Sequence, residues 1–230
     1  MTRRRSSKTV FALAAVVLAA AIAAPFWARA HGDSLPARCA GFEQESVQRA
    51  ALVTGKGTGT LVVGDSYSVG HLLTPRQSWP VRLPGRVHVA GFSGSGFAAT
   101  DSPCGLESYA DRAPAALRPG IRRVVVEGGL NDFDQHDGAI AAGFHRLMTE
   151  LKGRRVLVVG PPPAPSRVAE VPRLDALLAR LSAGAHVQYL SMAHARLDYL
   201  PDRLHPTAGS QRAFGDLVAA ALDHDSGSHH

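Results

Sequence analysis

The stretch GTLVVGDSYSVGHLL, Gly59–Leu73, changes character at Gly64. An apolar run ends there, and Asp65 and Ser66 then begin a segment with helix-like spacing. A buried strand that ends in a glycine turn and delivers a serine to the start of a helix is one way to present a nucleophile. Serine and aspartate are also favoured helix caps, so the stretch taken alone favours the simpler interpretation, a strand followed by an ordinary capped helix.

Similar apolar runs recur along the chain and indicate the fold class. Each is rich in valine or leucine, and the five runs are TLVVG, RVHVAG, IRRVVVEGG, RRVLVVGPPP and AHVQYLS. Short apolar strands separated by helix-length segments are typical of a parallel sheet that is covered on both faces. We therefore expect an α/β fold of three α/β/α layers with a central five-stranded parallel sheet. Helices are expected over residues 69–83, 106–117, 138–151, 171–181 and 207–222.

The N-terminus has the three parts of a secretory signal peptide. A basic start, MTRRR, precedes an apolar run over residues 10–27, and Ala28-Arg29-Ala30 has the small residues of a cleavage site. We expect cleavage after about Ala30 and a secreted, extracellular protein. An uncleaved anchor helix is the alternative, because the apolar run is near the lower length limit for spanning a bilayer. The adjacent arginines leave both the Sec and the twin-arginine export routes open.

Length and composition fit one domain. The chain has 230 residues, and 45% of them are hydrophobic, which is enough for a sizeable core. We expect residues 1–30 to be the signal peptide and residues 31–223 to form a single domain. The last residues, 224–230, read HDSGSHH and are expected to be a disordered tail.

The formal charge of +6 belongs mainly to the leader. Residues 1–30 hold five of the 25 basic residues and no acidic residue, which leaves 20 basic and 19 acidic residues in the rest of the chain. The exported protein would therefore be close to neutral and would lack the electrostatic footprint that binds a phosphate backbone. We expect no nucleic-acid partner and no stable membrane insertion after cleavage of the leader.

Two cysteines, Cys39 and Cys104, follow the leader and would meet an oxidising compartment. We expect a disulfide between them, and two unpaired buried thiols are the alternative. Closing so long a loop would stabilise the fold by roughly 4 kcal/mol if the loss of chain entropy in the unfolded state is the main effect.

Glycine-rich and polar motifs follow the first three expected strands. They are GDS at residues 64–66, GFSGSG at residues 91–96 and GGLND at residues 128–132. Ligands of open parallel sheets bind beyond the carboxyl ends of the strands, so these motifs are expected at one edge of the sheet.

A fourth motif lies near the C-terminus. Asp202 precedes His205 by three residues, so the carboxylate can hold the tautomer of the imidazole while the other ring nitrogen faces outward. Capping of a helix that begins at Pro206 explains the same residues equally well.

In this order and at these strand positions, the four motifs resemble those of the SGNH hydrolases, also called the GDSL family of esterases and lipases. The resemblance covers the chain from about Gly59 to Leu222. It implies a flavodoxin-like fold and a secreted serine esterase that hydrolyses carboxylic esters through an acyl-enzyme. We expect short-chain acyl or acetyl esters to be favoured, and no cofactor.

The resemblance also implies a role for each matching residue. Ser66 is expected to be the nucleophile, His205 the general base and Asp202 the residue that orients it. The backbone N–H groups of Ser66 and Gly94 and the side-chain amide of Asn131 would form the oxyanion hole. A hydroxyl is a weak nucleophile until an imidazole takes its proton, and the tetrahedral oxyanion needs fixed donors. Gly94 is the least direct match, because this chain lacks the asparagine that many members carry early in that block.

Other functions stay open as alternatives. The acyl-enzyme could pass its acyl group to a sugar or another alcohol, which would make the protein an acyltransferase. A non-catalytic glycan-binding relic of the fold is a further alternative, although the intact serine, asparagine, aspartate and histidine argue against it. The expected partner is a small-molecule, lipid or glycan ester, and the protein is expected to be a monomer.

Two other sites are not expected. The glycine-rich TGKGTG, residues 54–59, precedes the first strand and lacks the spacing of a phosphate-binding loop. Asp132, Asp134, His136 and Asp137 lack the spacing of a calcium loop and resemble a solvated loop, so we expect no metal.

Overall fold

The computed structural model describes residues 34–100 and 102–227. The expected signal peptide, residues 1–30, lies outside the described residues. The chain divides into two units, Met1–Gly41 and Phe42–His230. Helix α2, Leu35–Ala51, begins in the first unit and ends in the second, and the sheet and the candidate site belong to the second.

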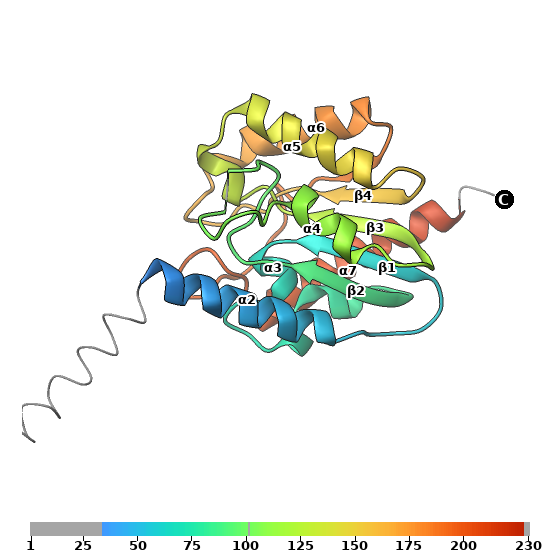
Figure 1. Ribbon diagram of the computed structural model, residues 1–230, viewed down its shortest axis with the longest axis horizontal. Helices are drawn as coiled ribbons and strands as arrows, with labels where there is room; N and C mark the ends of the chain where they lie inside the picture. Colours follow the sequence, from blue (N-terminus) through green and yellow to red (C-terminus); the bar gives the residue numbers. More distant parts are fainter. Residues whose placement is uncertain (1–33, 101, 228–230) are drawn as a thin grey trace, which may run out of the picture. The chain divides into compact units, whose positions relative to one another are not determined.

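The unit Phe42–His230 is built around a five-stranded sheet (Figure 1). Its strand order is β2-β1-β3-β4-β5, and all neighbouring strands are parallel. This is the order of flavodoxin-like folds. The predicted α/β fold with a five-stranded parallel sheet is therefore confirmed. The strands are β1 Gly59–Gly64, β2 Arg86–Gly91, β3 Ile121–Glu127, β4 Arg155–Val159 and β5 Gln188–Leu190.

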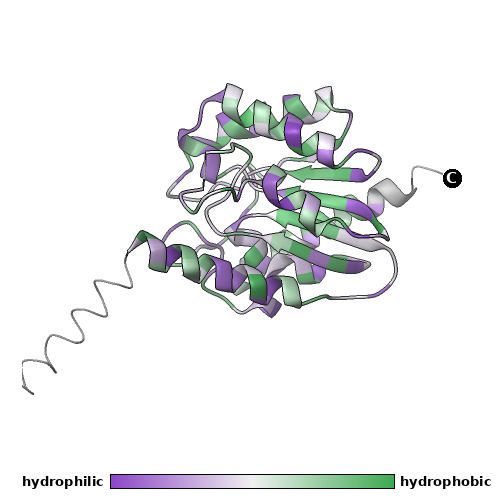
Figure 2. Ribbon diagram, viewed as in Figure 1, coloured by the Kyte–Doolittle hydropathy of each residue, from purple (hydrophilic) through white to green (hydrophobic). Residues whose placement is uncertain are grey.

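Helices cover both faces of the sheet, because side chains alternate between the faces and both sets are apolar. Leu61 and Val63 of β1 pack in the core under α4, α5 and α6, whereas Val62 packs in the core under α7. Figure 2 shows the central strands coloured mostly as hydrophobic. The helices are α4 Tyr109–Ala116, α5 Asp137–Glu150, α6 Val171–Gly184 and α7 Ala208–Gly227.

Four of the five expected helices are present with bounds shifted by a few residues, but the helix expected over residues 69–83 was wrong. Pro75 and Pro80 lack the N–H that a helix needs and disfavour helical backbone in the residue before them. Leu72 has a left-handed backbone with φ of 64°, which also ends a helix. The segment instead forms a short helix and two 3-10 turns, which are α3 Ser66–Val69, η1 Pro75–Gln77 and η2 Trp79–Arg82.

Two stretches of helix were not expected. Helix α2 precedes the first strand, and its fully buried residue is Arg49, which donates hydrogen bonds to Ser78 Oγ and Leu52 O. Because the buried residue of α2 is charged, a search for buried apolar positions at helical spacing does not reveal this helix in the sequence. Helix α7 continues to Gly227 and so includes residues 224–227 of the segment expected to be disordered.

Both cysteines, Cys39 and Cys104, are disulfide-bonded, as the sequence led us to expect. Within residues 34–100 and 102–227, no helix combines the length and apolar character that crossing a bilayer requires. The same part of the chain contains no group of three or more His, Cys, Asp or Glu side chains placed to hold a metal ion.

Candidate active site

The candidate site lies where β1 ends at the carboxyl edge of the sheet. Strand β1 ends at Gly64, and a Cβ there would lie 2.1 Å from Ser68 Oγ, so the close approach of the Ser68 side chain favours glycine. Asp65 caps the helix that follows, because its Oδ1 accepts the backbone N–H of Tyr67 at 2.9 Å. Ser66 is the first residue of α3. The sequence break at Gly64 therefore places the serine at the start of a helix.

Three of the residues singled out in the sequence form a continuous hydrogen-bonded chain. Ser66 Oγ lies 3.0 Å from Nε2 of His205, and Nδ1 of the same ring lies 2.6 Å from Oδ2 of Asp202. The second carboxylate oxygen accepts the backbone N–H groups of Leu204 and His205, which fixes the carboxylate. Because the carboxylate can only accept, Nδ1 carries the proton and the lone pair of Nε2 faces the serine.

Burial and hydrogen bonding set the protonation states of His205 and Asp202. Ser66 is 6% exposed and His205 is 9% exposed. Burial lowers the pKa of His205 below its ordinary value, although the hydrogen bond to Asp202 acts in the opposite direction. Burial alone would raise the pKa of Asp202, but the hydrogen bonds from His205 and the Leu204 N–H outweigh it and lower that pKa. At neutral pH a carboxylate therefore lies beside a neutral imidazole, which can accept a proton from a hydroxyl.

Gly94 and Asn131 belong to two other segments, which follow β2 and β3. Gly94 has φ of +76°, a backbone conformation that favours glycine, and no hydrogen bond among the described residues uses its N–H. Asn131 Nδ2 donates to the carbonyl oxygen of Ser95 at 2.9 Å and lies 3.4 Å from Oδ2 of Asp65. Ser95 directly follows Gly94 in the sequence, and Asp65 directly precedes Ser66. The 3.4 Å contact is long for a hydrogen bond, so the second amide hydrogen is open to a stronger acceptor.

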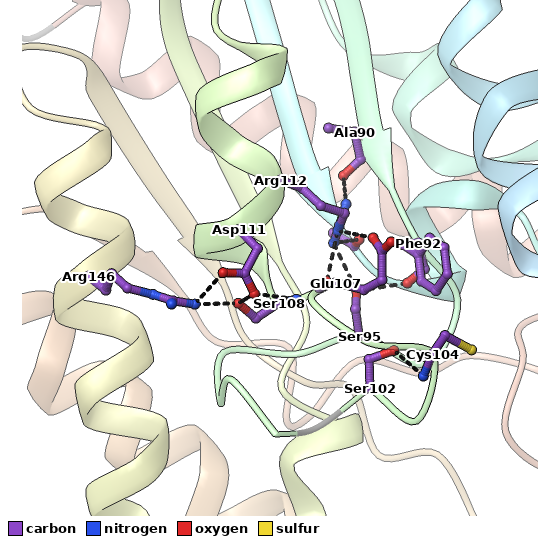
Figure 3. Close-up of polar contacts among 11 residues, drawn as sticks. Ala90, Phe92, Ser95, Ser102, Cys104, Glu107, Ser108, Asp111, Arg112 and Arg146 are labelled. Atoms are coloured by element: carbon purple, nitrogen blue, oxygen red, sulfur yellow. Dashed lines mark hydrogen bonds and ion pairs between the residues drawn. The ribbon is translucent and has the colours of Figure 1, made fainter. Parts of the chain in front are cut away.

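A half-buried arginine braces the loop that follows β2. Figure 3 shows Arg112 of α4 reaching Ala90 and Ser95. Its guanidinium donates to the carbonyl oxygens of Ala90 and Gly64, at the ends of β2 and β1, and to Ser95 Oγ at 2.8 Å. Its Nε donates to the carbonyl oxygen of Glu107 at 2.9 Å. The sequence analysis did not identify Arg112, because a single arginine within a helical segment gives no pattern.

Tyr67 joins the segment that carries the serine to the segment that carries the histidine. Its hydroxyl donates to the carbonyl oxygen of Leu204 at 2.5 Å. Its own carbonyl oxygen accepts from Nε2 of Gln211 on α7, and Oε1 of Gln211 accepts the backbone N–H of Trp79. The sequence analysis missed Tyr67 as well. Its position directly after the serine, in the first turn of the helix, is the one signal that the sequence offered.

Three further carboxyl groups are buried beneath the site, those of Asp65, Glu127 and Asp132. Burial raises the pKa of Asp65 to about 7 and that of Asp132 to about 6, and it raises the pKa of Glu127 well above its ordinary value. Asp132 was expected in a solvated loop, but its carboxylate accepts the N–H groups of Phe97 and Ala98 at 3.0 and 2.8 Å. It therefore anchors the loop that follows Gly94.

Solved structures with a similar fold are esterases by name. Est24, a carbohydrate acetylesterase from Sinorhizobium meliloti, is 18% identical with a TM-score of 0.62, and the match covers 73% of this chain and 99% of that one. The native M. smegmatis aryl esterase is 20% identical with a TM-score of 0.62, over the same shares of the two chains. A family two carbohydrate esterase from Clostridium thermocellum, in complex with cellohexaose, is 12% identical with a TM-score of 0.59, over 75% of this chain and 66% of that one. At these identities the likeness concerns the fold.

Sequence comparison identifies the family. A search of curated proteins finds no match. A scan against protein families matches residues 62–213, which include all of the hydrogen-bonded chain from Ser66 to Asp202 and His205. The family that matches is described as the GDSL-like Lipase/Acylhydrolase family. The resemblance found in the sequence is thus confirmed, and the chain belongs to the GDSL-like lipase/acylhydrolase, or SGNH, family.

Proposed function

We propose that this protein is a secreted serine esterase that hydrolyses carboxylic esters through an acyl-enzyme. The observation that carries the proposal is the 3.0 Å contact between Ser66 Oγ and His205 Nε2, with Asp202 hydrogen-bonded to the far side of the ring. Membership of a family of acylhydrolases supports ester chemistry at this site.

In the first half of the reaction, Ser66 Oγ attacks the carbonyl carbon of the ester while Nε2 of His205 takes its proton. The carbonyl electron pair moves to the oxygen and forms a tetrahedral intermediate. Its collapse breaks the ester C–O bond, and the alcohol leaves with the proton from His205. Asp202 holds the Nδ1 proton and stabilises the imidazolium that forms in between.

In the second half, a water molecule replaces the alcohol. His205 takes a proton from the water, the resulting oxygen attacks the acyl carbon, and the carboxylic acid leaves as Ser66 recovers its proton. Each half passes through an oxyanion. We assign its donors as the N–H groups of Ser66 and Gly94 and the amide of Asn131. The N–H of Ser66 suits this role because the first residue of a helix has no intrahelical acceptor.

Short-chain acyl or acetyl esters are the favoured substrates. Structures of similar fold are named as acetyl, aryl and carbohydrate esterases. Secretion is supported by the two disulfide-bonded cysteines, because disulfides persist in oxidising compartments.

The test compares wild type and Ser66→Ala on chromogenic esters of graded acyl length. Ser66→Ala should reduce turnover to background and leave the melting temperature unchanged, and a serine-directed phosphonate should label Ser66 alone. Labelling at Ser93 or Ser95 instead, or turnover by Ser66→Ala, would overturn the assignment. Product analysis with an added sugar alcohol separates hydrolysis from acyl transfer.

A further inference from the structure

A second imidazole lies against the ring of His205. The ring centroid of His71 is 4.8 Å from that of His205, and the two planes are inclined at 65°. Nδ1 of His71 lies 2.8 and 3.0 Å from the two carboxylate oxygens of Glu45. Glu45 belongs to helix α2, which precedes the family match at residues 62–213. Glu45 therefore lies outside the segment that matches the family, whereas His71 lies inside it.

Helix α2 also contacts the loop that carries Gly94. Oε2 of Glu45 accepts a hydrogen bond from Ser93 Oγ at 3.3 Å, and Ser93 directly precedes Gly94. One turn before Glu45 on the helix, the ring of Phe42 lies edge-on to His71 with centroids 5.5 Å apart. A Cβ at Gly94 would lie 3.6 Å from Cε2 of Phe42. One turn of α2 thus contacts both the histidine side and the oxyanion side of the candidate site.

The pair is placed to act on His205 by contact and by charge. The side chain of His71 is 20% exposed and that of Glu45 is 34% exposed, so solvent screens them only in part. Burial is the main cause that lowers the pKa of His205; His71 lowers this pKa further, whereas Glu45 raises it. A carboxylate at Nδ1 also fixes the His71 ring, because Nδ1 must then carry a proton.

Geometry explains why His205 needs a neighbour. The ring is held at Nδ1 by Asp202 and at Nε2 by Ser66. The contact at Nε2 is lost when Ser66 attacks the ester, so packing must then hold the ring in place. The ring of Tyr67 also lies near that of His205, with centroids 6.1 Å apart, and His71 is the nearer of the two rings. A swing of the ring would move Nε2 away from Ser66, and a displacement of about 1 Å can cost roughly 100-fold in rate.

We propose that Glu45 and His71 form a positioning pair, which holds the ring of His205 in the orientation that brings Nε2 to Ser66 and links it to the loop of Gly94. The proposal rests on the proposed function, because ring orientation affects turnover only if His205 is the base. Among the described residues, neither Glu45 nor His71 forms a hydrogen bond with Ser66 Oγ or with Nε2 of His205, so both act through other residues.

The test is steady-state kinetics on a short-chain ester with Glu45→Gln, His71→Ala and His71→Phe. Matched controls are Glu43→Gln, an exposed acid on the same helix, and His145→Ala, an exposed histidine on α5. Glu45→Gln and His71→Ala should each lower kcat by about 10-fold with KM within about twofold, and the controls should match wild type. His71→Phe should recover part of kcat, because it keeps a ring against His205.

Two further measurements distinguish a loss of ring positioning from a general loss of stability in these variants. In His71→Ala the acid limb of kcat/KM should move to higher pH, because the pKa of His205 is lowered first by burial and also by His71, and the variant reduces both effects. The double variant Glu45→Gln/His71→Ala should be no slower than His71→Ala, since the two residues act as one unit. Unchanged kcat in both single variants, or a loss confined to melting temperature, would refute the pair. If wild type itself fails to turn over esters, or Ser66→Ala retains turnover, the proposed function fails instead.

Discussion

The hydroxyl of Tyr67 donates a 2.5 Å hydrogen bond to the carbonyl oxygen of Leu204, 137 residues further along the chain. Tyr67 follows Ser66 and Leu204 precedes His205, so this bond joins the two segments that meet in the candidate site. The ring of Tyr67 also packs against Phe214 of α7, with centroids 6.2 Å apart. The distance between Ser66 and His205 therefore depends on a contact outside the hydrogen-bonded chain itself.

Replacing Tyr67 with phenylalanine should loosen that junction. We expect Tyr67→Phe to lower kcat by about 10-fold with little change in KM, and to lower the free energy of unfolding by about 1 kcal/mol, the usual net value of one hydrogen bond. Tyr189→Phe is a matched control, because it removes a tyrosine bond to Asp175, 2.6 Å long, away from the site. It should lose stability and keep kcat. Equal kcat in the two variants would show that the Tyr67 bond serves stability alone.

The sheet and the family could be predicted from the sequence because their signals are local. Valine-rich runs that end in glycine identify buried parallel strands, and a parallel sheet then gathers the ends of those strands at one edge. This rule places Ser66 and Asn131 at the same edge, but the role of each was inferred from the family resemblance. Asp202 and His205 needed the family resemblance, because their own spacing fits a helix cap equally well.

The rest of the site depends on contacts that no local pattern encodes. Glu45 and His71 are 26 residues apart and polar, and the helix that carries Glu45 buries an arginine, Arg49, instead of an apolar stripe. Arg112 donates hydrogen bonds to carbonyl oxygens of three segments, which come together only after folding. The spacing of apolar residues in a sequence indicates which apolar side chains are buried. It does not detect polar residues that hydrogen bonds hold in the interior.

The pH dependence of turnover should report the titration of His205. Burial lowers its pKa below the ordinary 6.5, and only the neutral ring accepts the serine proton. The value of kcat/KM should therefore rise with pH and reach half its plateau below pH 6.5. Asp202→Asn removes a hydrogen bond that raises this pKa, so the midpoint should fall further, while kcat drops by up to about 10⁴-fold. Rates measured from pH 4 to pH 9 check both, and a flat profile would exclude His205 as the base.

The buried carboxyl of Asp65 should make stability depend on pH in the opposite sense from a salt-bridged acid. Its pKa is raised to about 7 from an ordinary 3.8, so between these values the folded protein holds a proton that the unfolded chain releases. Its contribution to stability is fully present below about pH 3.8 and is lost as pH rises through about 7.

Asp65→Asn removes this titration. The melting temperature of the variant minus that of wild type should therefore rise between pH 4 and pH 8, as measured by thermal unfolding at a series of pH values. Asp223→Asn, at an exposed position on α7, is the control and should give a constant difference. A constant difference for Asp65→Asn as well would mean that its carboxyl is ionised in the folded protein throughout this range.

Asn131 allows the sharpest separation of a catalytic from a structural role. Its amide donates to Ser95 O, which is a ground-state contact, and its second N–H is assigned to an oxyanion that exists only during the reaction. If the second assignment holds, Asn131→Ala should lower kcat by roughly 10²–10³-fold, about 3–4 kcal/mol of transition-state stabilisation, with little change in KM. Loss of the Ser95 bond alone should cost about 1 kcal/mol of stability and little turnover.

Asn131→Asp refines the same measurement. The new carboxylate has no proton to donate and would lie beside Oδ2 of Asp65, 3.4 Å from the present amide nitrogen, so it opposes the developing negative charge. It should be no faster than Asn131→Ala. We would measure kcat, KM and melting temperature for both variants. A lowered melting temperature with nearly normal kcat would make Asn131 a brace for the Ser95 loop, and the oxyanion would then have to be held by the N–H groups of Ser66 and Gly94 alone.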